Sequence, residues 1–361
     1  MKVLHVIARM NVGGTATYLL NLLRGLEAAG IQTLLAVGSV PDNEREDLRL
    51  EQIKYRRIKC LSRAISPIRD LRARKDLWKL INEYQPDLIH CHTFKAGLLV
   101  RSKKSPIPVV HTFHGHHLYD PDYGKFAKAI LNLIERNLAK RCKKIITIGS
   151  KVGEELLNVG IGRNEQYLSI APGIESPKLS ERVRILNKFD LREKALKVLW
   201  MGRLTYVKRP DRVVELARRY PKVDFVVAGD GELKEDLLAS APSNLHLVGV
   251  QSSDEMFSIA DIVLLTSDSE GMPLTLIEGQ MAGVAALATA VGSTSEIIDN
   301  GITGIITTTD LNQISTDLGK LIDDSMLRST MGKKAKERAS SLFSIENMVS
   351  KHIKAYNEVV R

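Results

Sequence analysis

The sequence predicts an α/β protein of two lobes, each built around a parallel β-sheet, and three observations lead to this prediction. At 361 residues the chain is too long for a comfortable single core. Apolar runs of strand length alternate with amphipathic helical stretches along almost the whole chain, as successive βαβ units do. The alternation breaks once, at the stretch Ala171–Pro177 with its prolines and glycine, and then starts again.

The strands expected in the first lobe are apolar runs at residues 3–7, 33–37, 87–91, 109–112 and 144–148. Helices are expected between them, for example at residues 16–29 and 125–141. The strands expected in the second lobe lie at residues 197–201, 225–228, 262–266 and 284–288, with helices at residues 210–219 and 273–282.

A last helix is expected at residues 345–360, with apolar Met348, Ile353 and Tyr356 and no strand after it. We therefore expect this helix to cross back and brace the first lobe. The resulting division is a first lobe at residues 1–172 plus 345–361, a linker at residues 173–190, and a second lobe at residues 191–344.

Composition indicates a globular protein of a reducing cytoplasm. Hydrophobic residues make up 44% of the chain and charged residues 26%. The three cysteines, Cys60, Cys91 and Cys142, are too scattered for a disulfide framework or a cysteine-based zinc site. The apolar run at the N-terminus is too short for a signal peptide or a membrane span, so it is expected to form a buried strand.

Positive charge is concentrated in the first half of the chain. Residues 1–180 hold 29 basic and 17 acidic side chains, whereas residues 181–361 hold 23 basic and 25 acidic ones. The stretch Lys54–Lys79 alone contains ten basic and two acidic residues. It is equally consistent with a solvated helix face and with a surface that docks on an anionic membrane from the cytoplasmic side.

The first chemical motif, Glu270–Glu278, directly follows an expected buried strand. Gly271 permits a turn, and Pro273 suits the first position of a helix. Free backbone N–H groups near Gly271, Met272 and Leu274 would then form an anion site at the N-terminus of that helix. Glu270 and Glu278 add two carboxylates able to hold hydroxyl groups, although each alone could be an ordinary solvated side chain.

Two further motifs follow strands of the second lobe. Arg203 and Lys208, in Gly202–Arg209, are cations that could neutralise a diphosphate, and surface basic residues are the plain alternative. The turn Gly229-Asp230-Gly231 has small residues that could admit a nucleotide, but such turns are common.

In the first lobe, the paired glycines Gly13 and Gly14 follow the first strand, with Thr15 expected as the cap of the first helix. This spacing is not G-x-G-x-x-G, which argues against a dinucleotide-binding dehydrogenase.

Histidines gather after two expected strands of the first lobe. They are His90, His92, His111, His114, His116 and His117. Zinc is the less favoured interpretation, because no acidic ligand stands at metal spacing and no H-E-x-x-H motif occurs. A histidine that hydrogen-bonds substrate is favoured, with one or two of the others serving the structure.

In this order, these segments resemble the retaining glycosyltransferases of family 4, which have the GT-B fold. The resemblance covers essentially the whole chain and is strongest at Glu270–Glu278, at Gly202–Lys208 and at Gly13-Gly14. It implies two Rossmann-like lobes whose parallel sheets face an interlobe cleft. The sequence departs from the family at residues 292–296, which read Gly-Ser-Thr-Ser-Glu where Gly-Gly-x-Pro-Glu is usual, and at residues 283–285, Gly-Val-Ala instead of Gly-x-Pro.

The resemblance also implies roles for single residues. Glu278 is expected to hold the ribose of a nucleotide, and Glu270 to contact the transferred sugar. The leaving diphosphate is expected to bind Arg203 and Lys208, with His114 beside the donor sugar. The full expected site comprises the catalytic residues His114, Arg203, Lys208 and Glu270 and the donor-binding residues Gly13, Gly14, Gly229, Asp230, Gly271, Met272, Pro273, Leu274 and Glu278.

The expected reaction transfers a hexose from a nucleoside-diphosphate sugar, with a UDP-sugar favoured, to a glycan or lipid-linked acceptor of cell-surface polysaccharide or glycolipid synthesis. No metal or other cofactor is expected. Since no residue stands out as a covalent nucleophile, same-side displacement is expected. The alternatives are another enzyme on the same fold, such as a nucleotide-sugar epimerase or a phosphorylase, and, ranked last, a nucleic-acid-binding protein suggested by charge alone.

Overall fold

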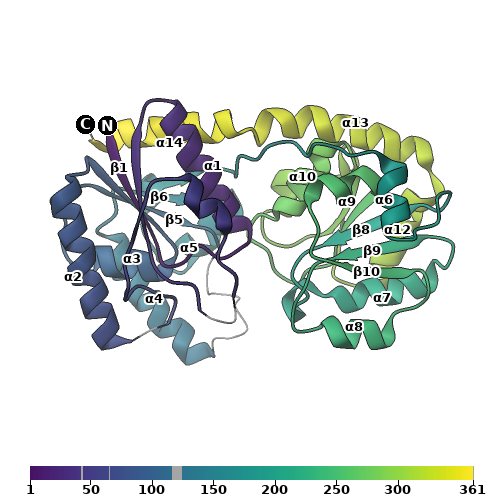
Figure 1. Ribbon diagram of the computed structural model, residues 1–361, viewed down its shortest axis with the longest axis horizontal. Coiled ribbons are helices and arrows are strands. Elements are labelled where there is room, and N and C mark those ends of the chain that lie inside the picture. The colour runs from purple at the N-terminus through teal and green to yellow at the C-terminus, as the bar shows by residue number, and fades with distance from the viewer. Residues whose placement is uncertain (42–43, 65, 116–123, 361) are drawn as a thin grey trace. The chain divides into compact units, whose positions relative to one another are not determined.

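The structure is a computed structural model that describes residues 1–41, 44–64, 66–115 and 124–360. The chain divides into two compact units, which are described separately (Figure 1). The first unit contains Met1–Ile174 and Phe343–Arg361, and the second contains Glu175–Leu342. The end of the chain therefore returns to the first unit, as the apolar positions of the predicted last helix indicated.

The first unit is built on a seven-stranded parallel sheet in the order β3-β2-β1-β4-β5-β6-β7. Its strands are β1 (Lys2–Ile7), β2 (Gln32–Val37), β3 (Tyr55–Arg57), β4 (Leu88–His92), β5 (Val109–Phe113), β6 (Lys144–Thr147) and β7 (Tyr167–Ser169). The five predicted strands are confirmed to within a residue at each end, and β3 and β7 were not predicted. These two are three residues long and half-polar, so they carry no apolar run.

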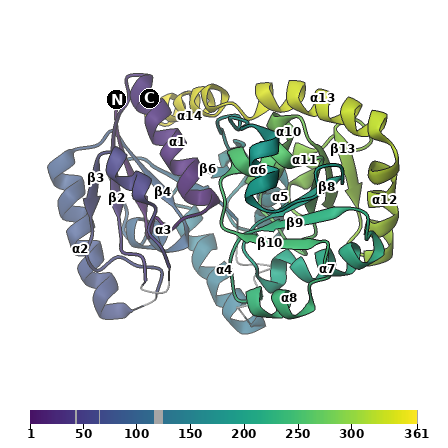
Figure 2. The same cartoon turned by 45° about the vertical axis from the view of Figure 1, so that its right-hand side comes forward.

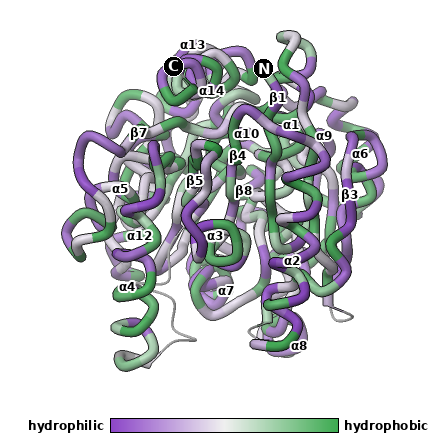
Figure 3. The backbone as a smooth tube through the Cα atoms, turned by 90° about the vertical axis from the view of Figure 1, so that its left-hand side faces the viewer, coloured by the Kyte–Doolittle hydropathy of each residue, from purple (hydrophilic) through white to green (hydrophobic). Residues whose placement is uncertain are grey.

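The helices of the first unit cover both faces of this sheet. They are α1 (Gly14–Ala28), α2 (Pro67–Tyr84), α3 (Phe94–Arg101), α4 (Lys125–Ala139), α5 (Ser150–Asn158) and α14 (Ile345–Val360). On one face, α2 and α3 pack on an apolar core that includes Leu4, Val6 and Ile89. Figure 3 shows hydrophobic residues along the strands and mixed hydropathy along α2.

The opposite face of the first sheet is covered by α1 and α14, which pack against each other. Gly25 permits this packing, because a Cβ atom there would lie 2.4 Å from Cγ2 of Val349. From α14, Met348 and Tyr356 are fully buried. The helix predicted at residues 345–360 is therefore confirmed in its bounds and in its return to the first unit.

The second unit is built on a six-stranded parallel sheet in the order β10-β9-β8-β11-β12-β13. Figure 2 labels β8, β9, β10 and β13 of this sheet. Its strands are β8 (Lys197–Met201), β9 (Asp224–Ala228), β10 (Leu245–Gly249), β11 (Ile262–Leu265), β12 (Ala285–Thr289) and β13 (Gly304–Thr307). Its helices are α6 (Arg182–Lys188), α7 (Pro210–Arg219), α8 (Lys234–Ser240), α9 (Ser253–Ile259), α10 (Leu274–Ala282), α11 (Thr294–Ile297), α12 (Leu311–Asp323) and α13 (Ser325–Leu342).

The core of the second unit is apolar and includes Trp200, Phe225 and Leu264 from three neighbouring strands. The segment expected as a linker, residues 173–190, contains helix α6, which packs on α9. Arg182 of α6 also donates to both carboxylate oxygens of Asp261 at 3.0 and 2.9 Å. Part of that segment therefore belongs to the body of the second unit.

Candidate active site

Both sheets reverse their strand order next to their first strand, at β1/β4 in the first unit and at β8/β11 in the second. In an open parallel sheet, the loops that leave such a point diverge and create a binding site at the carboxyl ends of the strands. The motifs singled out in the sequence follow these same strands: Gly13-Gly14 follows β1, Lys208 follows β8 and Glu270 follows β11.

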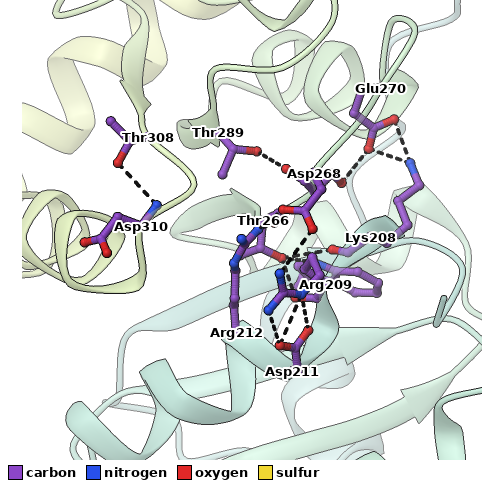
Figure 4. Close-up of polar contacts among 12 residues, drawn as sticks. Lys208, Arg209, Asp211, Arg212, Thr266, Asp268, Glu270, Thr289, Thr308 and Asp310 are labelled. Carbon is purple, nitrogen blue, oxygen red and sulfur yellow. Dashed lines mark hydrogen bonds and ion pairs between the residues drawn. The ribbon is translucent and has the colours of Figure 1, made fainter. Parts of the chain in front are cut away.

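Lys208 and Glu270 meet at the reversal point of the second sheet (Figure 4). The Lys208 Nζ atom donates to both carboxylate oxygens of Glu270, at 2.5 and 2.7 Å. Ser267 Oγ donates to Oε1 of the same carboxylate at 2.6 Å. The Glu270 side chain is 7% exposed and that of Lys208 is 22% exposed, so the ammonium is the more accessible partner of a largely desolvated ion pair.

A hydroxyl group fixes the backbone from which Lys208 extends. Thr266 Oγ1 lies 3.1 Å from the Lys208 carbonyl oxygen and 2.9 Å from that of Arg209, and it also accepts from the Trp200 indole N–H at 3.0 Å. These contacts tie the loop after β8 to the end of β11. Ser267 and Thr266 were not singled out in the sequence, although their place directly after a buried strand marks them.

The other basic residues near Lys208 differ from it. Arg209 contacts the carboxylates of Asp211 and Asp268, and Arg212 contacts Asp268 and the Thr266 carbonyl oxygen (Figure 4). Their charges are neutralised by acidic residues of the same unit, which is typical of a structural role. Arg203, expected beside Lys208, follows β8 with an exposed side chain.

Helix α10 begins one residue later than predicted. Pro273 is the N-cap, with extended backbone, and the first helical residue is Leu274. The expectation that Pro273 occupies the first helical position is therefore wrong, although its missing N–H is still harmless there. Met272 and Pro273 are buried, whereas Glu278 lies half-buried in the second turn.

The loop Glu270-Gly271 packs directly on the loop that follows β12. Ser293 N–H donates to the Gly271 carbonyl oxygen at 2.9 Å. Gly292 has φ 51°, and a Cβ atom there would lie 1.9 Å from the Glu270 carbonyl oxygen. Only glycine fits this position. The contact therefore explains the first glycine of the family's Gly-Gly-x-Pro-Glu pattern, which is retained here as Gly292 although Ser293 replaces the second.

The turn Gly229-Asp230-Gly231 also serves loop packing. A Cβ atom on Gly229 would lie 1.9 Å from the carbonyl oxygen of Gly202. The Leu204 N–H donates to the Asp230 carbonyl oxygen at 3.0 Å. These contacts bring the loops after β8 and β9 side by side, and the Asp230 side chain is exposed.

The first helix begins at the paired glycines, with one correction. Its N-cap is Gly13 and its first residue is Gly14, so Thr15 lies inside the helix and is not the cap. The Thr17 N–H donates to the Gly13 carbonyl oxygen at 3.1 Å. The first turn therefore begins two residues earlier than it would if Thr15 were the cap. Gly14 and Thr15 are exposed or half-buried at the end of β1.

The histidines form a buried layer on the side of the first sheet that α1 and α14 cover. The rings of His5, His90 and His92 lie within 4.1 to 5.4 Å of one another, measured between centroids. His92 Nδ1 lies 3.1 Å from Nε2 of His114, which is half-buried. His111 points to the other face, next to Arg101 and Gly97. His116 and His117 lie outside the described residues.

Three members of this layer come from outside the histidine motif. His5 lies inside β1, and His352 and Tyr356 come from α14. The alternation of β1, in which Val3, His5 and Ile7 share a face, could have pointed to His5. No local signal could have joined α14 to this layer, because more than 200 residues separate it from β4.

Burial keeps these imidazoles neutral. Loss of hydration lowers the pKa of His5 and of His114 to about 3 and that of His352 to about 4. The pKa values of His90 and His92 are lowered well below the usual range for the same reason. At neutral pH the layer therefore consists of uncharged rings, each with one N–H donor and one acceptor nitrogen.

Among the described residues, His5, His90 and His92 have nitrogens within 4.8 Å of one another and could by distance hold a metal ion. Both nitrogens of His90 are engaged, however, with Tyr356 OH and Thr112 Oγ1 at 2.6 Å each. His5 Nδ1 and His92 Nε2 lie 3.1 Å apart and bind each other. A metal ion would have to break these hydrogen bonds in a layer whose three rings are fully buried.

Two family models match the chain. Residues 12–175 match Glycosyltransferase Family 4, and residues 181–338 match Glycosyl transferases group 1. The chain belongs to glycosyltransferase family 4. This glycosyltransferase thus has the activity class that its motifs predicted, and the alternatives of an epimerase, a phosphorylase or a nucleic-acid-binding protein are not supported.

Relatives of the enzyme include bacterial transferases. It is 26% identical to the UDP-Gal:alpha-D-GlcNAc-diphosphoundecaprenol alpha-1,3-galactosyltransferase of Escherichia coli over 84% of this chain and 83% of that protein. It is 30% identical to the O-antigen biosynthesis glycosyltransferase WbnH of Escherichia coli over 52% of this chain and 54% of that protein.

Solved structures confirm the GT-B fold. The sucrose-phosphate synthase of Thermosynechococcus elongatus matches with a TM-score of 0.86 at 17% identity, covering 99% of this chain and 98% of that one. HepE of Anabaena in complex with UDP matches with a TM-score of 0.84 at 17% identity, covering 99% and 100%. Across the described part of the glycosyltransferase, no helix combines the length and apolar character that crossing a membrane requires.

Proposed function

We propose that this glycosyltransferase transfers a hexose from a UDP-sugar to a lipid-linked or glycan acceptor, with retention of the anomeric configuration. The observation that carries the proposal is the Lys208–Glu270 pair at the reversal point of the second sheet. The named substrates of the relatives support the finer part, since the Escherichia coli galactosyltransferase uses UDP-Gal and a diphosphoundecaprenol-linked acceptor. HepE, in turn, has been solved with UDP-glucose.

The ion pair suggests how a donor would be received. Transfer breaks the bond between the anomeric carbon and a diphosphate oxygen, so negative charge grows on the diphosphate. Lys208 is the more accessible partner and can turn from Glu270 to the phosphate, where its charge stabilises the leaving group. Glu270 then loses one partner, keeps Ser267, and can accept hydrogen bonds from the sugar hydroxyls.

Arg203 and the N-terminus of α10 would complete the site for the diphosphate. The first N–H groups of a helix have no partner within it and favour a negative charge nearby. Glu278 lies in the second turn of the same helix, where it would hold the ribose. Of the other expected donor contacts, Gly13, Gly14 and His114 lie at the carboxyl edge of the first sheet.

A donor screen tests this proposal. The purified enzyme is incubated with UDP-, GDP- and ADP-sugars and a polyprenyl-diphosphate-linked N-acetylhexosamine, and the released nucleotide is measured. We expect release with a UDP-hexose, and NMR of the product should show the anomeric configuration of the donor. An inverted product would overturn retention, and turnover with a GDP- or ADP-sugar in place of every UDP-sugar would overturn the donor assignment.

We further propose that α2 and α4 dock this enzyme on an anionic membrane that carries the acceptor. Within Lys54–Lys79, the exposed side chains of α2 include Arg69, Arg72, Lys75 and Lys79. Arg72, Lys75 and Lys103 also line a pocket of about 670 Å³ with Trp78, and Lys103 Nζ lies 5.1 Å from the centre of the Trp78 ring.

Apolar side chains lie near these cations. Ile68 and Leu71 of α2 are 70% and 59% exposed. Phe126, Ile130 and Leu133 of α4, three or four residues apart on one helix face, are 80%, 44% and 60% exposed. Helix α3 contacts both α2 and α4, so the charged and apolar strips belong to the same side of the first unit. Such a combination fits phospholipid headgroups and the acyl boundary beneath them.

Vesicle flotation tests the docking. We expect binding to vesicles with 30 mol% phosphatidylglycerol but not to phosphatidylcholine alone, with loss at high salt, because each cation near such a surface contributes about 1 kcal/mol. The charge reversals R72E and K75E should abolish binding. Matched reversals at exposed lysines of α14, K351E and K354E, should leave most of it. Equal loss in both pairs would indicate a net-charge effect and contradict the proposed surface.

A further inference from the structure

Three imidazoles form a hydrogen-bonded row across the first sheet, from inside β1 to the end of β5. His5 Nδ1 lies 3.1 Å from His92 Nε2, and His92 Nδ1 lies 3.1 Å from His114 Nε2. We call these three residues the imidazole row. His5 and His92 are fully buried and His114 is half-buried, so the row leads from the interior to the carboxyl edge of the sheet.

Because a neutral imidazole has one N–H, each ring of the row can donate at only one nitrogen. His92 uses both nitrogens, so it must accept from one neighbour and donate to the other. The row therefore has two possible proton orders. Either His5 donates to His92 and His92 donates to His114, or His114 donates to His92 and His92 donates to His5.

The buried end of the row distinguishes the two orders. Within the described part of the chain, Nε2 of His5 is buried and has no hydrogen-bond partner. If His114 were the first donor, this nitrogen would carry an N–H with nothing to receive it, and orphaned buried N–H groups are rarer than under-used acceptors. The order that starts at His5 leaves a bare nitrogen there instead.

We propose that His5 and His92 are positioning residues that hold His114 neutral with its proton on Nδ1. In this order Nε2 of His114 accepts from His92 Nδ1–H, and the other nitrogen of His114 is always a hydrogen-bond donor. This inference rests on the proposed function in one respect, since it gives His114 a fixed donor for an oxygen of the donor sugar. The tautomer itself is independent of that function.

A second network beside the row shows how firmly such an order can be imposed. The Met348 carbonyl oxygen can only accept, so His352 must donate to it from Nδ1, at 2.8 Å. His352 Nε2 then accepts from Tyr18 OH at 2.9 Å. The positions of the His352 and Tyr18 protons are therefore fixed by the Met348 carbonyl oxygen.

The network continues to His90 and Tyr356. Thr112 lies next to Tyr18, and its hydroxyl oxygen lies 2.6 Å from His90 Nε2. The other nitrogen of His90 lies 2.6 Å from Tyr356 OH. None of the described hydrogen bonds links this network to the imidazole row, although the rings of His90 and His92 lie 4.1 Å apart. Tyr356→Phe is therefore a matched control of equal depth.

Nitrogen-15 NMR of the full chain labelled at histidine tests the tautomer directly. We expect a protonated Nδ1 and an unprotonated Nε2 for His114 and His92 at pH 7.5, with His114 identified by the signals that H114Q removes. A protonated Nε2 on His114, a charged ring, or averaged shifts would each overturn the proposal. This outcome does not depend on transferase activity, so failure of the proposed function is recognised separately.

Two amide variants at position 92 test the positioning role. The side-chain nitrogen of asparagine can take the place of Nδ1, whereas that of glutamine reaches the place of Nε2. We expect H92N to preserve the His114 tautomer and to keep kcat/KM for the donor within about twofold. H92Q should release the tautomer and lower kcat/KM about tenfold, the scale of one lost hydrogen bond. Y356F should leave the tautomer of His114 unchanged.

All three variants are compared by thermal melting, and H92N and H92Q are expected to melt alike. Equal tautomers and equal kinetics in H92N and H92Q would overturn the positioning role even if both fold. A shifted His114 tautomer in Y356F would show that the row is not independent of the second network, and this too would contradict the inference.

Discussion

The reversal points of the two sheets place polar groups at a binding edge in opposite ways. In the second unit the groups are charged and paired, as in Lys208–Glu270 and Arg212–Asp268. In the first unit they are buried neutral rings whose pKa values lie far below the usual range of histidine. Paired charges can be exchanged for those of a ligand, whereas neutral rings offer donors whose direction is fixed. The first arrangement suits a diphosphate and the second suits hydroxyl groups.

Acid should produce the largest difference in stability between the two units, because the layer of buried neutral histidines belongs to the first unit. The pKa of His5 is about 3 and that of His352 about 4 in the folded chain, against about 6.5 when unfolded. The unfolded state therefore binds more protons below pH 6.5. Each such ring lowers the free energy of unfolding by up to about 1.4 kcal/mol per pH unit from there toward its folded pKa, and the full stability is present above pH 6.5.

Tryptophan fluorescence during urea unfolding at pH 7.5 and pH 5 measures this effect. The chain has two tryptophans, Trp78 in the first unit and Trp200 in the core of the second. W200F then reports the first unit and W78F the second. We expect the unfolding midpoint of the first unit to fall further in acid. An equal fall in both units would contradict the assignment of the acid-sensitive groups.

Lys208→Ala should lower kcat by about a hundredfold to a thousandfold, because in the proposed mechanism it removes the charge that stabilises the leaving diphosphate. Its control is Lys188→Ala, which removes the lysine of another ion pair in the same unit, with Glu255 at 2.8 Å. Initial rates at saturating donor measure both. Full turnover in Lys208→Ala, or an equal loss in the control, would show that the exchangeable pair is not part of catalysis.

Gly292→Ala should destabilise the second unit by about 1–3 kcal/mol and lower turnover, because the methyl group meets the Glu270 carbonyl oxygen and φ is positive. Gly301→Ala is the matched control: φ is 79° and nothing lies within 4 Å of the added Cβ. Gly301→Ala should lower the free energy of unfolding by only about 1 kcal/mol, the strain of a non-glycine residue at positive φ. Urea unfolding of both variants in the W78F background gives the difference, and equal values would argue against the loop contact.

Tyr356→Phe should have the smallest effect, a loss of about 1 kcal/mol in the first unit, because one buried hydrogen bond to His90 disappears. Tyr55→Phe removes a hydroxyl that donates to Glu51 at 2.7 Å on the surface and should change little. Both are measured by urea unfolding in the W200F background. A larger loss for Tyr55→Phe would contradict the view that burial decides the value of these bonds.

Strands with continuous apolar runs could be predicted from the sequence, and β8 and α7 were predicted to the residue. The three-residue β3 and the mostly half-buried β10 could not, because strand pairing supplies most of their stability and leaves little trace in composition. The helix start at Gly14 was missed since a glycine cap has no side chain that marks it.

Of the candidate site, the sequence placed Lys208 and Glu270 each after a strand but gave no reason to pair them. That contact depends on the order of β8 and β11 in the sheet. The other histidines of the first unit were noticed in the sequence. His5, which completes the imidazole row, was not, because its neighbours in the sequence are those of an ordinary buried strand. The assignments of Arg203, Asp230 and Glu278 to a ligand stay predictions.

The return of α14 to the first unit has a consequence for synthesis of the chain. During translation, the whole second unit leaves the ribosome before α14 does. Until then the first unit lacks the α14 side chains that hydrogen-bond Tyr18 and His90. N-terminal domains usually fold first, but here the first unit can complete its fold only after the second unit has been translated. Until Ile345–Val360 is translated, the nascent enzyme lacks the helix that covers this layer of histidines together with α1.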